Sequence, residues 1–175
     1  MEAVRYEEFY TIEDYDRWEG RWELIEGRPY AMSPAPLIGH QRVSLQLAKL
    51  LDEGACEGCL ALQDIDYVVS EETVVRPDVL LICDVEEERL TKTPKMVFEI
   101  VSPSTARRDE TIKFSIYERE GVAYYGLVYP SLRVVKLYRR NALGRFEKVG
   151  DFSKESVTLE EERCTMMLDF GKIWP

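Results

Sequence analysis

Apolar residues recur at helical spacing in two long stretches of the chain. In residues 37–52 they lie three or four positions apart, and Gly54 follows as a stop signal. A second apolar stripe runs from about residue 104 and ends before Gly121. The pattern therefore predicts two substantial helices, separated by a long segment with a different periodicity.

The remaining periodic segments mostly predict strands. A short helix is expected over residues 11–20, and residues 21–32 are expected to form two short strands that turn at Glu26 and Gly27. Because strands and helices are mixed along one chain of 175 residues, we expect a single α+β domain over residues 1–175, with a mixed β-sheet flanked by helices. Further strands are predicted near 60–69, 74–83, 95–101, 122–128, 133–138 and 145–149.

Two carboxylates interrupt apolar strand-like runs that have no obvious use for a charge. Asp78 lies within the run 74–82, and Glu99 lies within the run 96–101. A carboxylate in a low-dielectric environment is costly unless it is paired, neutralised or bound to a cation. Two such groups on neighbouring strands predict a metal site.

Composition narrows the class of function. The chain has 23 basic and 33 acidic residues, a net charge of −10 that argues against a general binder of polyanions. Nucleic acid remains compatible with a site where metal ions and a local basic patch offset the phosphates. The acidic, polar N-terminus and the absence of a long apolar run predict a cytoplasmic protein without a membrane partner. The 32% of charged residues, with three Gln and one Asn, suggest a heat-adapted source.

The four cysteines provide little functional signal. Cys56 and Cys59 have C-x-x-C spacing, whereas Cys83 and Cys164 stand alone and the chain has one histidine. A structural zinc site would need a second suitably spaced pair. The pattern favours free thiols, with at most one local disulfide.

Lys113 adds a cation to the two carboxylates. It falls on the second predicted long helix, with Asp109 and Tyr117 four residues to either side on the same face. Phosphodiester hydrolysis needs oxygen ligands for Mg²⁺ or Mn²⁺, a bound water of lowered pKa, and a cation that orients the water and offsets transition-state charge. Asp78, Glu99 and Lys113 supply these parts. The structural alternative is a surface ion pair between Asp109 and Lys113, with Tyr117 used for packing.

Several short motifs occur in a specific order along nearly the whole chain. They are WELIEG at 22–27, MSP at 32–34, His40, RPDV at 76–79, EIVSPST at 99–105, Asp109, Lys113, Tyr117 and GV at 121–122. In this order they resemble the Uma-type restriction endonucleases of the PD-(D/E)XK nuclease superfamily. The resemblance implies a restriction-endonuclease-like fold and a Mg²⁺- or Mn²⁺-dependent endonuclease with DNA as the expected substrate. It also implies a homodimer, which superfamily members commonly use to cut both strands of a duplex.

The resemblance implies roles for individual residues. Asp78 and Glu99 bind the metal, and the main-chain carbonyl of Ile100 is a further ligand. The superfamily usually places its lysine two residues after the glutamate, but Val101 occupies that position here. The resemblance therefore implies that Lys113 reaches the site from the helix instead.

Four further residues are predicted to support the site. Glu23 corresponds to an extra acidic residue of the superfamily that binds a second metal or holds a metal-bound water. His40 corresponds to a family histidine that contacts phosphate or the site. Taken alone, these two residues would more simply be a surface charge on a hairpin and a polar residue near a helix start. Arg107 and Arg108 begin the helix that carries Lys113, so both are predicted to contact phosphate.

The chain departs from the family pattern after residues 121–122. Tyr124, Gly126 and Tyr129 stand where the family usually has an acidic residue, an aromatic residue and an aspartate. Two alternative functions stay open at this point. One is a catalytically degenerate nuclease-fold protein that binds nucleic acid or a protein, and the other is a metal-dependent hydrolase of small phosphate esters.

Overall fold

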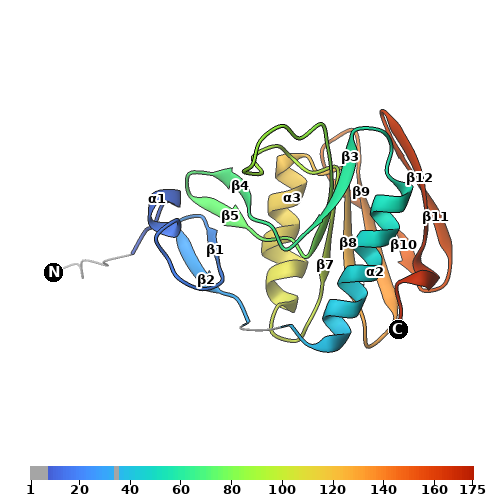
Figure 1. Ribbon diagram of the computed structural model, residues 1–175, viewed down its shortest axis with the longest axis horizontal. Helices are drawn as coiled ribbons and strands as arrows, with labels where there is room; N and C mark the ends of the chain where they lie inside the picture. Colours follow the sequence, from blue (N-terminus) through green and yellow to red (C-terminus); the bar gives the residue numbers. More distant parts are fainter. Residues whose placement is uncertain (1–7, 34–35) are drawn as a thin grey trace.

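The computed structural model describes residues 8–33 and 36–175, so Pro34 of the MSP motif lies outside the described residues (Figure 1). No helix in this part of the chain has the length and apolarity needed to span a bilayer. The elements are α1 Ile12–Tyr15, β1 Trp22–Ile25, β2 Arg28–Ala31, α2 Ile38–Gly54, β3 Cys59–Gln63, β4 Tyr67–Ser70, β5 Thr73–Val75, β6 Val79–Cys83, β7 Met96–Ile100, η1 Arg108–Lys113, α3 Phe114–Glu120, β8 Tyr124–Tyr129, β9 Val134–Arg140, β10 Phe146–Phe152, β11 Ser156–Glu161, β12 Cys164–Asp169 and η2 Phe170–Lys172.

A six-stranded mixed sheet forms the centre of the fold, in the order β10-β9-β8-β7-β6-β3. Strands β7 and β8 are parallel, because the chain passes between them through η1 and α3, and the other neighbours are antiparallel. The sheet lies between α2 and α3 (Figure 1). The prediction of an α+β fold with a mixed sheet flanked by helices is confirmed.

Strand β7 divides its side chains between the two faces of this sheet. Met96, Phe98 and Ile100 pack in the core cluster that contains the buried side of α2, whereas Val97 packs with residues of α3. Successive strand residues point to opposite faces. Glu99 therefore shares the face of Val97 and points toward α3.

A second sheet, in the order β2-β1-β5-β4, brings the start of the chain to the central sheet. The hairpin of β1 and β2 turns at Glu26 and Gly27, as predicted, and both residues have positive φ (50° and 75°), as in a type I′ turn. Leu24 on β1 pairs with Val74 on β5. Because β5 leads directly to the start of β6, this pairing carries Glu23 to the region of Asp78.

Two of the predicted strands are each divided in the structure. Asp64 has a φ of 51°, and the predicted strand 60–69 becomes β3 and β4 in different sheets. Pro77 lacks an N–H group, and the predicted strand 74–83 becomes β5 and β6. Asp78 consequently lies in the segment just before β6. The hairpin of β11 and β12, which packs on α2, was not predicted.

The prediction for the cysteines is wrong, because all four pair in two long-range disulfides. Cys56 pairs with Cys164, across 108 residues, and Cys59 pairs with Cys83, across 24 residues. Cys59 and Cys83 face each other in the register of β3 and β6. The two cysteines of the C-x-x-C motif therefore have different partners. Cys56, which follows α2, is joined to β12, and Cys59, at the start of β3, is joined to β6.

Candidate active site

Lys113 lies at the centre of a buried cluster of charged groups. Its Nζ is 2.5 Å from Glu99 Oε1, 2.8 Å from Glu23 Oε1 and 3.4 Å from the main-chain carbonyl oxygen of Arg76. These partners come from β7, β1 and the segment between β5 and β6. The structure thus brings together Glu23, Glu99 and Lys113, three of the residues that the sequence singled out.

A π-helical turn carries Lys113 into the cluster. The predicted helix from residue 104 contains the π-helix η1, which is followed directly by α3. Single π-turns within helices are rare and recur at functional sites. Asp109 and Lys113, four residues apart in η1, are both buried, so a surface ion pair between them is excluded. The hydroxyl of Tyr125 donates to the main-chain oxygen of Asp109 at 2.7 Å and fixes this turn to β8.

Asp78 lies beside the same cluster and is held by two groups. Its Oδ2 accepts a hydrogen bond from the main-chain N–H of Ile100 at 2.7 Å, which places it next to Glu99 along β7. Its Oδ1 is 3.2 Å from Nε2 of His40, which lies in the first turn of α2. His40 Nδ1 is buried and has no hydrogen-bond partner among the described residues. The predicted site therefore collects side chains from both helices and both larger sheets.

The two glutamates that share Lys113 differ in their electrostatics. Burial would raise the pKa of Glu23, but Lys113, the N–H of Arg76 and Arg108 hold the pKa below its ordinary value. Burial raises the pKa of Glu99 well above its ordinary value; Lys113 opposes this shift, and Asp109, Asp78 and Glu23 add to it. Environments that separate the pKa values of neighbouring carboxyls are typical of functional sites. At Glu99, burial and the neighbouring carboxylates thus outweigh the compensation that Lys113 provides.

Two further groups in the cluster also have shifted pKa values. Burial raises the pKa of Asp109 to about 6, against the opposing effects of Lys113 and Thr105. Burial would lower the pKa of His40, but its hydrogen bond to Asp78 and the charge of Asp78 raise it overall. The site as a whole has more carboxylates than cations facing them.

The two predicted phosphate contacts occupy different environments. Arg108 Nη1 is 3.0 Å from Glu23 Oε2, and its guanidinium lies 4.9 Å from the ring centroid of Tyr30. Arg107 is exposed at the start of η1. Arg108 is thus part of the buried network around Glu23, whereas Arg107 faces solvent beside it.

Comparison with known proteins places this chain in a family. Residues 6–166 match the family model Uma2, described as "Putative restriction endonuclease". The chain belongs to the Uma2 family. An uncharacterized protein of Synechocystis sp. is 31% identical over 142 residues, which cover 74% of this chain and 73% of that protein. A crystal structure from Anabaena variabilis, titled "a putative nuclease belonging to DUF820", has a TM-score of 0.75 at 16% identity and covers 94% of this chain and 97% of its own. The predicted family and restriction-endonuclease-like fold are confirmed.

The hydroxyl of Tyr117 is a site contact of this Uma2 protein that the sequence analysis assigned to packing. It donates a hydrogen bond to Glu99 Oε1 at 2.8 Å, in a fully buried environment. Tyr117 follows Lys113 by four residues, which places both side chains on the same side of the helix. That spacing was the available signal, and it indicated a shared face without indicating the hydrogen bond.

We expect Tyr117→Phe to lower the free energy of unfolding by roughly 1.5–3 kcal/mol, because the buried Glu99 carboxylate loses a hydrogen-bond donor. Tyr129→Phe is the matched control. It also removes a hydroxyl that donates to a glutamate, at 2.7 Å from Glu110 Oε1, but this hydrogen bond is exposed to solvent. Its effect should stay within about 0.5 kcal/mol. Urea unfolding of both variants checks the prediction, and equal effects would contradict it.

The donor set of the Uma2 site is compatible with a divalent cation. Among the residues that the structure describes, no three His, Cys, Asp or Glu side chains are grouped so that they could hold a metal ion. Mg²⁺, however, is usually held by one or two carboxylates, with water and substrate phosphate as its other ligands. Asp78 and Glu99 with the carbonyl of Ile100 match that smaller set, and the under-compensated charge of Glu99 favours a cation.

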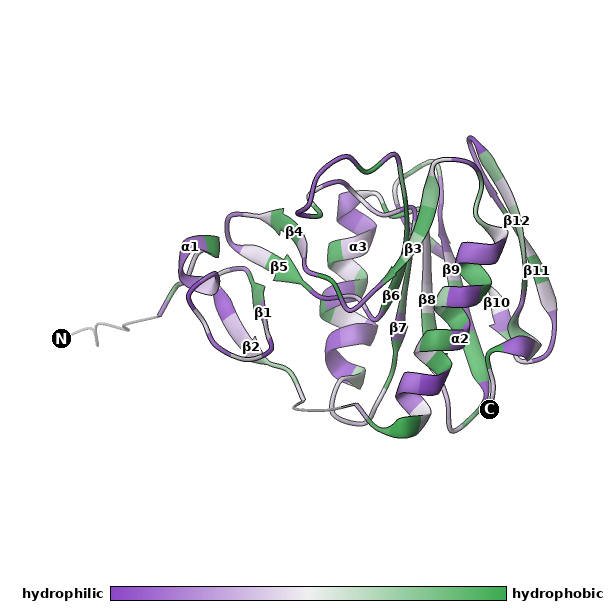
Figure 2. Cartoon of the chain, in the orientation of Figure 1, coloured by the Kyte–Doolittle hydropathy of each residue, from purple (hydrophilic) through white to green (hydrophobic). Residues whose placement is uncertain are grey.

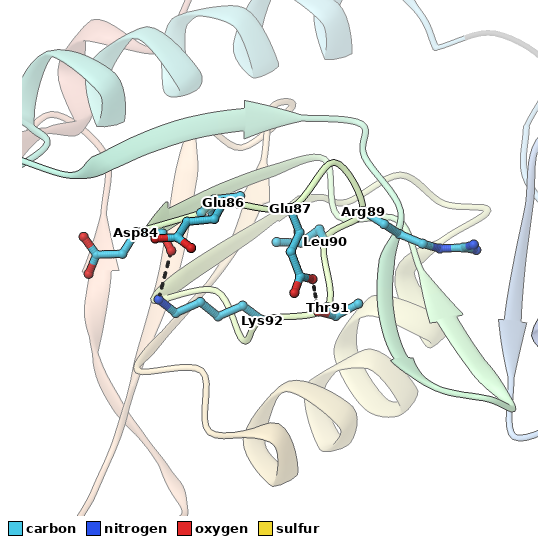
Figure 3. A pocket seen from close by; sticks show the side chains of 8 residues that line it. Asp84, Glu86, Glu87, Arg89, Leu90, Thr91 and Lys92 are labelled. Atoms are coloured by element: carbon cyan, nitrogen blue, oxygen red, sulfur yellow. Dashed lines mark hydrogen bonds between the residues drawn. The ribbon is translucent and has the colours of Figure 1, made fainter.

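A cavity in the loop between β6 and β7 is separate from this site. It is lined by residues 84–87 and 89–92, none of which is a predicted site residue (Figure 3). Inside it, Lys92 Nζ donates to the main-chain oxygens of Cys83 and Asp84 at 2.8 and 3.3 Å, and Thr91 donates to Glu87 at 3.0 Å. These bonds hold the loop together, and the cavity adds nothing to the candidate active site.

Proposed function

We propose that this Uma2 protein is a Mg²⁺- or Mn²⁺-dependent endonuclease that hydrolyses phosphodiester bonds of nucleic acid, with DNA as its substrate. The observation that supports this most directly is the buried contact of Lys113 with Glu99 and Glu23, beside Asp78. Carboxylates that can hold a metal ion next to a lysine cation supply the charge stabilisation that favours phosphodiester hydrolysis. The Anabaena variabilis protein that is titled "a putative nuclease" shares the fold.

Asp78, Glu99 and the carbonyl of Ile100 would hold the metal. When bound, the metal would act as a Lewis acid toward the phosphate and acidify water. The other site residues position these ligands. The N–H of Ile100 and Nε2 of His40 hold the two oxygens of Asp78, and the hydroxyl of Tyr117 and Nζ of Lys113 both contact Glu99 Oε1.

Lys113 acts as a cation in this proposal. Its neighbouring carboxylates raise its pKa above the ordinary value of a lysine despite complete burial, so its ammonium stays protonated. It can donate a hydrogen bond to the attacking water and offset negative charge on the phosphorane-like transition state. Glu23 fixes the ammonium in place at 2.8 Å, a positioning role in addition to the metal-related role predicted from the family. Arg107 and Arg108 would contact the flanking phosphates, and a homodimer would present two such sites to a duplex.

The test is cleavage of plasmid and oligonucleotide DNA by the purified chain with Mg²⁺, with Mn²⁺ or with a chelator. We expect nicking with either metal, none with the chelator, and recovery on adding excess Mn²⁺. RNA and small phosphate esters serve as alternative substrates. Turnover of the small esters without cleavage of DNA would overturn the proposal in favour of a small-ester hydrolase. Metal-dependent DNA binding without cleavage of any substrate would favour a catalytically degenerate binding protein.

A further inference from the structure

The start of α2 exposes two large apolar side chains close to the candidate active site, one on the N-cap residue and one on the first helical residue. Leu37 and Ile38 are each 82% exposed, and the first turn of α2 is strongly hydrophobic in Figure 2. Leu37 precedes His40 by three residues and lies on the same side of the helix, whereas Ile38 is in the adjoining position and projects to another side. His40 in turn contacts Asp78 at 3.2 Å. Contiguous exposed apolar surface beside a site can mark contact with a partner.

The stretch of sequence that contains this turn lacks acidic residues. Residues 27–51 contain no Asp or Glu, although the chain has a net charge of −10. Two of the three glutamines in the chain, Gln41 and Gln46, are exposed on α2, as are Arg42 and Lys49. Lys49 is paired only through an exposed contact with Glu53 at 3.7 Å, which is worth a few tenths of a kcal/mol. The exposed side chains of this stretch therefore add no negative charge of their own where a polyanion would approach.

We propose that Leu37 and Ile38 form a wedge that enters the base stack of double-stranded nucleic acid beside the cleaved bond. The inference rests on the proposed nuclease function and specifies its substrate as a duplex that is unstacked at one step. Proteins that kink duplexes commonly insert Leu or Ile between base pairs and offset the cost of unstacking with other contacts. Arg42, one helical turn after Ile38 on the same side, supplies a cation for the adjacent backbone.

A second copy of the chain fits this surface less well. An antiparallel two-fold contact between α2 helices would pack Ile38 against Leu45, which is 58% exposed. Arg42 lies near the midpoint between these residues, so the same contact would place each Arg42 opposite Gln41 of the other copy and bring the two guanidinium groups close together. Like charges facing each other across an interface are unfavourable. The positive charge at the middle of the stripe favours a polyanion as its occupant.

The wedge also implies a preference among base steps. Pyrimidine–purine steps such as TA and CA unstack and kink most easily, so the energy needed to admit Leu37 and Ile38 is lowest there. We expect tighter binding and faster cleavage at these steps, without contacts to the edges of particular bases. The preference should disappear when the two apolar side chains are replaced.

The experiment compares Leu37→Ser/Ile38→Ser with Leu143→Ser, which removes an equally exposed leucine (88% exposed) in the turn between β9 and β10. The probe is duplex DNA with 2-aminopurine at a TA step, first titrated without divalent metal. We expect fluorescence to rise on binding to the wild-type chain and to Leu143→Ser, and to stay flat with the double variant. Its affinity for the duplex should fall about tenfold. With metal, its cleavage of intact duplex should fall while its cleavage of a duplex with a mismatch at the step is retained.

Each other outcome is informative. An unchanged fluorescence rise and affinity in the double variant would overturn the wedge. The wedge would also be overturned if sedimentation showed the double variant to be a monomer and the wild-type chain a dimer, while both unstacked the duplex equally. The surface would then contact a second copy of the chain. If the wild-type chain cleaves no substrate, the proposed nuclease function fails, but the fluorescence titration still decides whether the wedge enters a duplex.

Discussion

Lys113→Met is expected to lower the free energy of unfolding by roughly 3–5 kcal/mol at neutral pH and to abolish cleavage. Removing one partner of a buried ion pair leaves the other charge uncompensated, which costs this much in proteins generally. Here two carboxylates, Glu23 and Glu99, would lose the ammonium that lies 2.8 and 2.5 Å from them. Urea unfolding and the DNA-cleavage assay measure the two effects separately.

The pH dependence of this loss identifies its cause. In Lys113→Met, burial raises the pKa of Glu99 without opposition and also raises that of Glu23, whose main compensating charge is gone. A carboxyl whose pKa is higher in the folded state favours folding when it is protonated, and that stability is lost as pH rises above its unfolded pKa of about 4.3. The deficit relative to wild type should therefore be small near pH 4 and grow toward neutral pH.

Two control variants distinguish buried charge from lost packing. Lys49→Met removes a lysine whose pair with Glu53 is exposed, and it should change stability by less than about 0.5 kcal/mol. Adding Glu23→Gln and Glu99→Gln to Lys113→Met should restore much of the stability, because the two side chains that contact the missing ammonium then carry no charge, while activity stays absent. A loss under about 1 kcal/mol for Lys113→Met, constant from pH 4 to 8, would contradict the charge argument.

The central residues of the candidate site could be predicted because they are charged residues within segments that are otherwise apolar on the same face. Glu99 stands in an apolar strand, and the alternation of β7 fixes its face once the strand is identified. Helical spacing placed Lys113 on one face with Asp109 and Tyr117. This grouping holds in the structure despite the π-turn, because all three side chains are buried. The sequence pattern did not predict the hydrogen bonds within the site. The contacts of Tyr117 with Glu99 and of Asp78 with Ile100 depend on the packing of separate elements.

The disulfides and the second sheet show why the rest was not predictable. Pairing of Cys59 with Cys83 depends on the register of β3 and β6, and pairing of Cys56 with Cys164 depends on the docking of a hairpin 108 residues away. Neither is encoded in the spacing of the C-x-x-C motif. Structural disulfides are uncommon in a reducing cytoplasm outside heat-adapted organisms. A cytoplasmic location and a heat-adapted source both stay predictions.

The departure from the family pattern at Gly126 has a local structural reason. A Cβ atom at this position would lie 2.2 Å from the ring of Phe98, whose Cα is its partner across β7 and β8. Phe98 in turn packs in the core on the face toward α2. An aromatic side chain at residue 126 is thus incompatible with Phe98 in its present position. The substitution repacks this part of the sheet, while Glu99, which points to the opposite face, keeps its contacts.

Asp78→Asn is expected to reduce metal-dependent cleavage at least about a hundredfold, or ~2.7 kcal/mol of transition-state stabilisation, with little loss of stability. In the wild-type chain the N–H of Ile100 donates a hydrogen bond to Asp78 Oδ2 at 2.7 Å. An asparagine has nearly the same shape, and its amide oxygen can accept this hydrogen bond. It lacks the negative charge that a divalent cation requires of this ligand. The side chain is partly exposed, so neutralising it should cost about 1 kcal/mol of folding stability or less.

The matched control for Asp78→Asn is Asp66→Asn. Asp66 is also a partly buried carboxylate with two hydrogen bonds, from Arg76 Nε at 2.7 Å and from the hydroxyl of Tyr15 at 3.0 Å, but it contacts none of the proposed metal ligands. Calorimetric titration with Mn²⁺ should show binding to wild type and Asp66→Asn and none to Asp78→Asn. Cleavage should follow the same order, while thermal unfolding shows both variants folded. If Asp78→Asn instead binds Mn²⁺ and cleaves DNA as wild type does, Asp78 is not a metal ligand, and the two-carboxylate site must be rebuilt around Glu99 with another partner.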